Sequence, residues 1–226
     1  MDLTTSYEKV IPAEVRGRYQ FVETRNAAAV LKASNPELFD EIMKVLTDFT
    51  LYSSDILTPG GNRGQIPIRL DSAFEKLGWS AVRITTEWRL LGERKLAAAK
   101  RDYEDKYMES SVRNPGFEVD NMKGRVALDV EWNAKDGNLD RDLSAYRSLY
   151  EVGLIDVAVI ITRDHAGIRN LALEDLKNAD AARRLGTTTT TNIEKVRDRM
   201  TRGDSGGCPV LVVAITRNTW EGHADK

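Results

Sequence analysis

The chain has 226 residues, with 33 Lys and Arg against 35 Asp and Glu, so its formal net charge is −2. This length is typical of one large domain or two small ones, and it can bury a core without disulfides. One cysteine and two histidines exclude a disulfide framework and a zinc site of the usual nitrogen and sulfur ligands. A bound metal would therefore need carboxylate ligands, which suit a hard ion such as magnesium.

The charge balance and the apolar pattern limit the kinds of partner that the sequence predicts. A near-neutral chain is not expected to coat nucleic acid nonspecifically, although it can concentrate positive charge in one cleft. The sequence has no run of 18 apolar residues and no apolar signal core near Met1, so we expect no membrane segment. Together with the single cysteine, this predicts a protein of a reducing compartment such as the cytoplasm.

The first half of the chain gives helix and strand signals in turn. Residues 18–22 are typical of a strand, and Asn35 and Pro36 predict the start of a helix of about 16 residues. We expect Asp71 to cap a short helix that ends at Gly78, followed by an extended segment. Residues 93–112 are predicted to form a helix, with Leu96, Tyr103 and Tyr107 on one face, either packed on the core or at a dimer interface.

The second half carries a strand–helix–strand pattern. Residues 125–132 alternate in hydrophobicity, residues 154–162 and 210–216 are nearly continuous apolar runs, and residues 139–152 have a helical pattern. Continuous apolar strands are typical of a sheet covered on both faces. We therefore predict an α/β fold with a mixed central sheet flanked by helices, forming a single domain over residues 1–226.

Two acids stand on one face of the strand at residues 125–132. Because side chains alternate, Asp129 and Glu131 point away from Val130 and Trp132. Asp120 lies nine positions before Asp129 with Gly124 between them, so a turn could return it beside Asp129. Three convergent carboxylates are what a divalent cation needs for phosphate chemistry. The alternative is an edge strand whose acids point into water.

With this segment the chain resembles the BglII/BstYI-type restriction endonucleases, a branch of the PD-(D/E)XK nucleases related to BamHI. The resemblance covers residues 60–217, and the order and spacing of its pieces carry it. These pieces are Gly64-Gln65-Ile66-Pro67-Ile68, Ala73-Phe74-Glu75-Lys76-Leu77-Gly78-Trp79, Asp120 to Trp132, Leu154 to Arg163, and Gly207-Cys208-Pro209-Val210-Leu211-Val212.

The resemblance implies roles for four residues. Asp120 and Asp129 look like the two metal-binding acids, although the family usually has Glu at the second position. Glu131 matches the third position, where a carboxylate can orient or deprotonate the attacking water or hold a second metal. Gln65 matches a polar residue that supports the water network in the family, or it is an exposed loop amide.

The resemblance also implies a reaction and partners. The expected reaction is hydrolysis of duplex DNA with Mg²⁺, leaving 5′-phosphate and 3′-hydroxyl ends. A palindromic site, with a GATC core and 5′ overhangs as in the family relatives, implies a homodimer, because protein symmetry mirrors site symmetry. A cognate DNA methyltransferase is expected genetically rather than as a bound partner. A DNA-binding nuclease-fold protein without catalysis is the alternative, since Asp129 is shorter than Glu.

Polar side chains after two strands are candidates for DNA contact. The residues just after the catalytic strand approach the bases in the family, and a second group follows the next strand. The candidates are Asn133, Lys135, Asn138, Arg163, His165, Arg169, Asn170 and Arg202, with Arg63 and Arg199 as further possibilities. A loop histidine with one hydrogen bond and solvated surface charges are the alternative interpretations.

The segment Gly203-Asp204-Ser205-Gly206-Gly207 matches the nucleophile segment of chymotrypsin-like serine proteases. That chemistry needs Ser205 beside a histidine base, and the chain has only His165 and His223. That protease fold is all-β, whereas this sequence has clear helical patterns. A glycine-rich turn before a strand explains the segment without catalysis.

Overall fold

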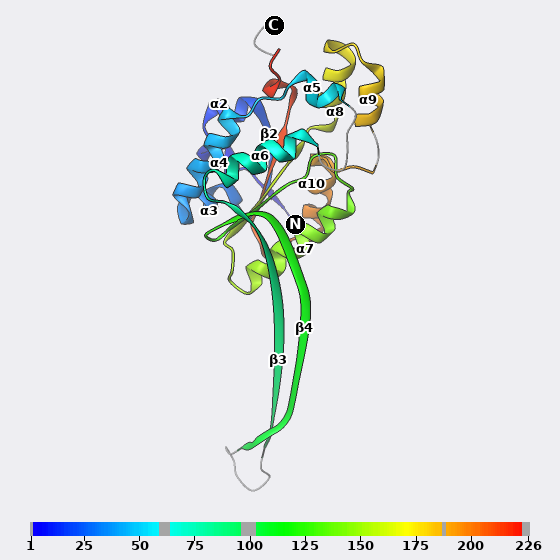
Figure 1. The fold of residues 1–226 in the computed structure, drawn as a ribbon. Helices are drawn as coiled ribbons and strands as arrows, with labels where there is room; N and C mark the ends of the chain where they lie inside the picture. The colour runs from blue at the N-terminus through cyan, green and yellow to red at the C-terminus, as the bar shows by residue number, and fades with distance from the viewer. Residues whose placement is uncertain (1, 59–63, 96–102, 187–188, 223–226) are drawn as a thin grey trace. The chain divides into compact units, whose positions relative to one another are not determined.

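A computed structural model describes residues 2–58, 64–95, 103–186 and 189–222, without the side chains of residues 94–95 and 103–108. The chain divides into two compact units (Figure 1). The larger unit comprises Met1–Ala81 and Val119–Lys226, and the smaller comprises Val82–Glu118. The single domain expected over residues 1–226 stays a prediction.

In the described residues, seven strands form a mixed sheet in the order β1-β2-β7-β6-β5-β4-β3. The strands β5, β6 and β7 run parallel, while β2 is antiparallel to β7 and β4 is antiparallel to β5. This arrangement confirms the predicted α/β fold and the βαβ unit. The strands are β1 (Leu3–Thr4), β2 (Tyr19–Thr24), β3 (Ser80–Lys95), β4 (Tyr103–Lys123), β5 (Val126–Val130), β6 (Val157–Arg163) and β7 (Val210–Ile215).

Helices cover both faces of the central strands. Leu128 of β5 and Val159 of β6 belong to a core cluster with Leu31, Phe39 and Leu70 from three helices, whereas the opposite face carries α7 and α10. The helices are α1 (Tyr7–Val10), α2 (Ala13–Arg18), α3 (Ala27–Ser34), α4 (Pro36–Asp48), α5 (Ser53–Leu57), α6 (Gln65–Glu75), α7 (Gly137–Glu151), α8 (His165–Asn170), α9 (Ala179–Leu185) and α10 (Ile193–Arg202), with a π-helical turn at Leu171–Asp175 and a 3₁₀ turn at Arg217–Thr219.

The sequence predicted the starts of two helices, one correctly and one wrongly. Helix α4 begins at Pro36 after the N-cap Asn35, as predicted, and ends at Asp48. The prediction that Asp71 caps a helix is wrong, because α6 already begins at Gln65 and Asp71 lies inside it. The amide of Gly78, whose φ is +86°, bonds the carbonyl of Glu75 where the chain leaves the helix.

The described residues of the smaller unit form strands rather than a helix, so the predicted helix over residues 93–112 is wrong. Cross-strand contacts join β3 to β4: the Arg89 Nη2 to Glu109 Oε1 distance is 3.0 Å, and Ser111 Oγ donates to Glu87 Oε1 at 2.6 Å. Gly116 lies so close to the Ile84 carbonyl that a Cβ would clash with it. Leu96 lies outside the described residues, and the side chains of Tyr103 and Tyr107 are not described.

Candidate active site

A tight hairpin brings the first two predicted acids together. Asn121 of β4 pairs with Leu128 of β5, and Gly124 at the turn has a φ of +55°. This register places Asp120 opposite Asp129, and the Asp120 amide donates to Asp129 Oδ1 at 2.8 Å. The turn postulated from the nine-residue spacing is therefore present.

The acids of β5 lie inside the protein. Asp129 is 3% exposed and Glu131 is 4% exposed, so the interpretation of an edge strand in water is wrong. Asp120 remains exposed. The backbone of Glu131 is held firmly, since its amide donates to Ile161 and its carbonyl accepts from the hydroxyls of Thr162 and Thr191.

Helix α7 adds two buried groups that the sequence analysis missed, Asp142 and Tyr146. The Tyr146 hydroxyl donates to Asp129 Oδ2, and Asp142, 1% exposed, lies next to Glu131. Glu131 and Asp142 can share a hydrogen bond only when one of them is protonated. When both are carboxylates, Glu131 Oε2 and Asp142 Oδ2 have no donor among the described residues. The only sequence signal for Asp142 and Tyr146 was their spacing of four residues, which places both on one side of a helix.

Burial dominates the electrostatics of this acid cluster. Desolvation, with the nearby charge of Asp142, raises the pKa of Asp129 to about 7 and the pKa of Glu131 to about 9. Desolvation also raises the pKa of Asp142. Carboxyl groups in such surroundings hold protons near neutral pH unless a cation compensates their charge.

The donor set fits a hard divalent cation. Asp120, Asp129 and Glu131 offer only oxygen ligands, and Glu131 Oε2 is a buried acceptor without a donor. Among the described residues, no three carboxylate, thiol or imidazole groups already converge as a finished metal centre. Asp129 accepts one hydrogen bond on each oxygen, from the Asp120 amide and from the Tyr146 hydroxyl. Each oxygen keeps a second lone pair that can bind a cation.

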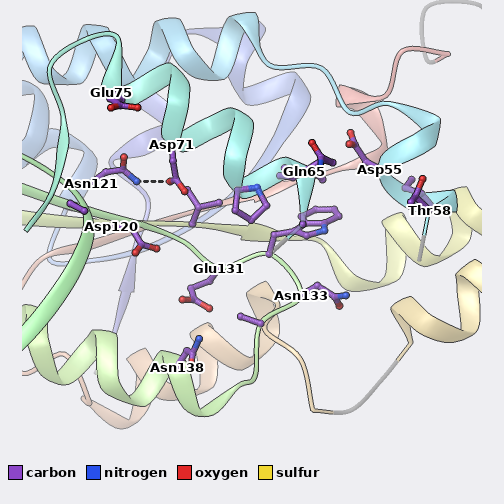
Figure 2. Close-up of a pocket in the computed structure, with 18 of the residues that line it drawn as sticks. Asp55, Thr58, Gln65, Asp71, Glu75, Asp120, Asn121, Glu131, Asn133 and Asn138 are labelled. Carbon is purple, nitrogen blue, oxygen red and sulfur yellow. Dashed lines mark hydrogen bonds between the residues drawn. The ribbon is translucent and has the colours of Figure 1, made fainter. Parts of the chain in front are cut away.

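A cleft of about 940 Å³ opens over these acids in the larger unit (Figure 2). Asp120 and Glu131 line it, as does Gln65, which is the first residue of α6 rather than a loop amide. Helix α6 adds two acids that were not predicted, Asp71 and Glu75. The Asn121 side chain donates to Asp71 Oδ1 at 2.7 Å, next to Asp120 in the chain.

The predicted DNA contacts fall into two groups. Asn133 and Asn138 line the cleft, and Lys135 is exposed between them. Asn133 has a φ of +59°, a backbone strain that is concentrated at functional sites in proteins.

The second group is absent from the lining of the cleft in the described residues. Arg163 is fully buried, while His165 is half-buried and Arg169 and Asn170 are exposed on α8. The Arg202 guanidinium lies 2.9 Å from Asp204 Oδ2. Arg63 lies outside the described residues.

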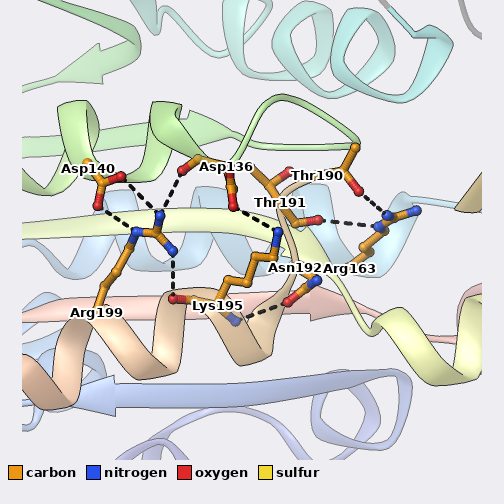
Figure 3. Close-up of polar contacts among 8 residues, drawn as sticks. All are labelled: Asp136, Asp140, Arg163, Thr190, Thr191, Asn192, Lys195 and Arg199. Atoms are coloured by element: carbon orange, nitrogen blue, oxygen red, sulfur yellow. Dashed lines mark hydrogen bonds and ion pairs between the residues drawn. The ribbon is translucent and has the colours of Figure 1, made fainter. Parts of the chain in front are cut away.

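A network of polar contacts supports the loop after β5 (Figure 3). The Lys195 ammonium lies 2.9 Å from Asp136 Oδ2, and the Arg199 guanidinium binds Asp140 and the Asp136 carbonyl. The buried Arg163 donates to Thr190 Oγ1 and to the carbonyls of Thr191 and Leu185. Arg163 thus anchors the threonine segment, residues 189–191, and Thr191 of this segment binds the Glu131 carbonyl.

Ser205 does not form a protease site in this structure. It is completely buried in the turn after α10, and its hydroxyl has no hydrogen-bond partner among the described residues. His223 lies outside the described residues. The glycine-rich turn before β7 accounts for the segment.

Comparison with known protein families decides the identity. The model of the family "Restriction endonuclease BglII/BglIII" matches residues 19–215, which include the hairpin, the acid cluster and the sheet. The chain belongs to this family. No curated protein gives a significant match to the sequence.

Membership of the BglII/BglIII family establishes the class of reaction. The chain is a type II restriction endonuclease, a hydrolase whose substrate is DNA. Enzymes of this kind generally use a divalent metal ion, which agrees with the carboxylate-rich cleft. In the described residues, no helix has the length and hydrophobicity needed to cross a bilayer.

Proposed function

We propose that Asp120, Asp129 and Glu131 form the catalytic centre, which hydrolyses a DNA phosphodiester with Mg²⁺. The observation that carries this proposal is the burial of Glu131 beneath a cleft lined by acids, where its Oε2 has no hydrogen-bond partner other than Asp142 among the described residues. A buried carboxylate without a compensating charge destabilises the fold, because burial of an unpaired charge is costly. Its presence is explained if it binds a cation.

Each residue has a defined part in the reaction. Asp120 and Asp129, with Glu131, would hold the ion, and Mg²⁺ when bound supplies charge neutralisation at the phosphate and a more acidic water. Glu131 Oε2 orients the attacking water and accepts its proton. The water attacks phosphorus, the bond from phosphorus to the 3′-oxygen breaks, and the products carry 5′-phosphate and 3′-hydroxyl ends. Gln65 orders water at the mouth of the cleft.

DNA recognition is assigned to the loop after β5. Asn133, Lys135 and Asn138 present amide and ammonium groups beside the acids, and these groups suit base edges in the major groove. We infer a homodimer that reads a palindrome with a GATC core and leaves 5′ overhangs. A cognate methyltransferase would protect the host DNA.

The test is incubation of the protein with phage DNA, with and without Mg²⁺. Discrete fragments that appear only with the metal support the proposal, and sequencing of their ends gives the site and the overhang. Retardation of the DNA without cutting would point instead to a binding protein. Asp120→Ala should abolish cleavage while DNA binding persists, whereas wild-type cutting by this variant would exclude the assigned site.

A further inference from the structure

Arginine on helix α7 reaches the cleft beside the catalytic acids. Arg141 lines the cleft together with Asn138, three residues earlier and therefore on the same side of the helix. Its side chain is 59% exposed, so the guanidinium is accessible from the cleft. It also lies close enough to Glu131 and Asp129 to interact with them electrostatically.

The guanidinium of Arg141 is fixed by its own neighbour in the chain. Nε and Nη2 both donate to Asp142 Oδ1, at 3.1 Å and 3.0 Å. Asp142 is 1% exposed, and among the described residues its other oxygen, Oδ2, has no hydrogen-bond donor unless Glu131 is protonated. An arginine held through one edge keeps Nη1 for a further acceptor, in a planar geometry that suits phosphate oxygens.

The charge balance of the cleft demands such a cation. Its described lining contains five acids and two arginines: Asp55, Asp71, Glu75, Asp120 and Glu131, against Arg141 and Arg184. Arg184 Nη2 is engaged at 3.0 Å with the Leu57 carbonyl, at the end of α5. Asp55 is already paired with Arg69, so without the two arginines one divalent ion would compensate two of the four remaining acidic charges. A phosphodiester that approaches the others is repelled unless positive charge lies beside it.

We propose that Arg141 binds a backbone phosphate of the DNA next to the catalytic acids, and that Asp142 positions it. This inference rests on the proposed function, because it takes DNA to occupy the cleft. Arg141 is the binding group, whereas Asp142 acts only through Arg141 and through its contact with Glu131. Helix α7 thereby supplies part of the active site that strand β5 lacks, a fixed positive charge.

The test compares Arg141→Gln with Arg141→Lys and with Arg147→Gln. Arg147 is on the same helix, pairs with Glu151 at 2.9 Å and is not among the described residues that line the cleft, so it is a matched loss of charge. Binding to a short duplex that carries the mapped cleavage site is measured in EDTA over a range of KCl concentrations. Steady-state cleavage of the same duplex is measured with Mg²⁺, and melting temperatures verify folding.

Arg141→Gln should reduce the slope of log K against log salt by about 0.9 per subunit, the value for one lost phosphate contact. It should lower kcat/KM by about 10- to 100-fold, as expected for a lost hydrogen bond to a charged group. Arg141→Lys keeps the charge and should keep the slope. Arg147→Gln should change neither quantity.

A double variant tests the role of Asp142. If Asp142 only positions Arg141 for binding, Asp142→Ala combined with Arg141→Gln should have the same salt slope as Arg141→Gln alone. Equal slopes for Arg141→Gln and the wild type, or equal losses for Arg141→Gln and Arg147→Gln, would overturn the inference. A wild-type protein that neither binds nor cuts the duplex would overturn the proposed function itself.

Discussion

Two polar clusters flank the end of strand β5, and they are built in opposite ways. In the acid cluster of Asp129, Glu131, Asp142 and Tyr146, carboxyl groups face one another and two oxygens have no donor. In the network of Figure 3, by contrast, carboxylates are matched by Lys195 and Arg199. Paired carboxylates and cationic side chains hold the loop in place, whereas carboxyl groups that face one another in the interior need a bound cation to compensate their charge.

The largest effect is expected at the acid cluster. Glu131→Gln keeps the size of the side chain but removes the proton acceptor, so the cleavage rate should fall by about 10²- to 10⁴-fold. DNA binding and the melting temperature should not fall, because burial raises the pKa of Glu131 to about 9, so that the acid is protonated without metal and Gln is likewise uncharged. Single-turnover cleavage and calorimetry measure the two quantities. Activity close to that of the wild type would place the reaction elsewhere.

The largest loss of stability is expected in the supporting network. Arg163→Ala leaves the buried carbonyls of Thr191 and Leu185 without the Arg163 donor. Each unsatisfied group costs about 1–3 kcal/mol, so the free energy of unfolding should fall by about 3 kcal/mol. Urea denaturation measures this loss. The control Arg183→Ala removes an exposed ion pair to Asp180 and should cost less than about 1 kcal/mol. Similar losses in both variants would contradict the structural role of Arg163.

The two clusters should respond to pH in opposite directions. Asp129 and Glu131 have a folded-state pKa above the ordinary values of 3.8 and 4.5, so their stabilisation is complete at low pH and is lost as the pH rises through about 7 and 9. Lys195 lowers the pKa of Asp136 and Arg199 lowers that of Asp140, so this stabilisation is lost as the pH falls below the ordinary range.

The melting temperature of the metal-free protein between pH 5 and pH 9 measures the first response. We expect it to fall with rising pH in the wild type and to fall less in Asp129→Asn and Glu131→Gln. The same slope in all three proteins would show that these acids are not the titrating groups.

The smallest expected effect joins the two clusters. Thr191→Val preserves shape but removes the hydroxyl that donates to the Glu131 carbonyl at 2.7 Å. Because Thr162 still donates to the same oxygen, the loss of stability should be about 1 kcal/mol. Chemical denaturation measures this loss. A loss of several kcal/mol would contradict the prediction and mean that the threonine segment takes up another conformation in the variant.

Local sequence features predicted where the three acids lie in the fold. Alternation along β5 separated Asp129 and Glu131 from Val130, and the spacing with Gly124 brought Asp120 back. These features are local, since they depend only on the period of a strand and on one turn. The functional assignment needed the resemblance to a family, because acids at alternate positions are also common on exposed strands.

The errors come from contacts that no local pattern encodes. Asp142 and Tyr146 reach the buried acids only because α7 packs beneath β5, and Arg163, which was predicted to contact DNA, is buried and donates to Thr190. The predicted helix over residues 93–112 is wrong because the charged side chains of this segment favour a helix locally, whereas its described part is strand that pairs as β3 with β4, and no local pattern encodes that pairing.

The most direct test of the central claim is calorimetry of Mg²⁺ binding near pH 7 in buffers of different ionisation enthalpy. If Asp129 and Glu131 hold protons until a cation compensates them, Mg²⁺ binding should release protons, so the observed heat should vary with the buffer. Asp129→Asn should bind more weakly and release fewer protons. Equal affinity and equal proton release in the variant and the wild type would contradict the account.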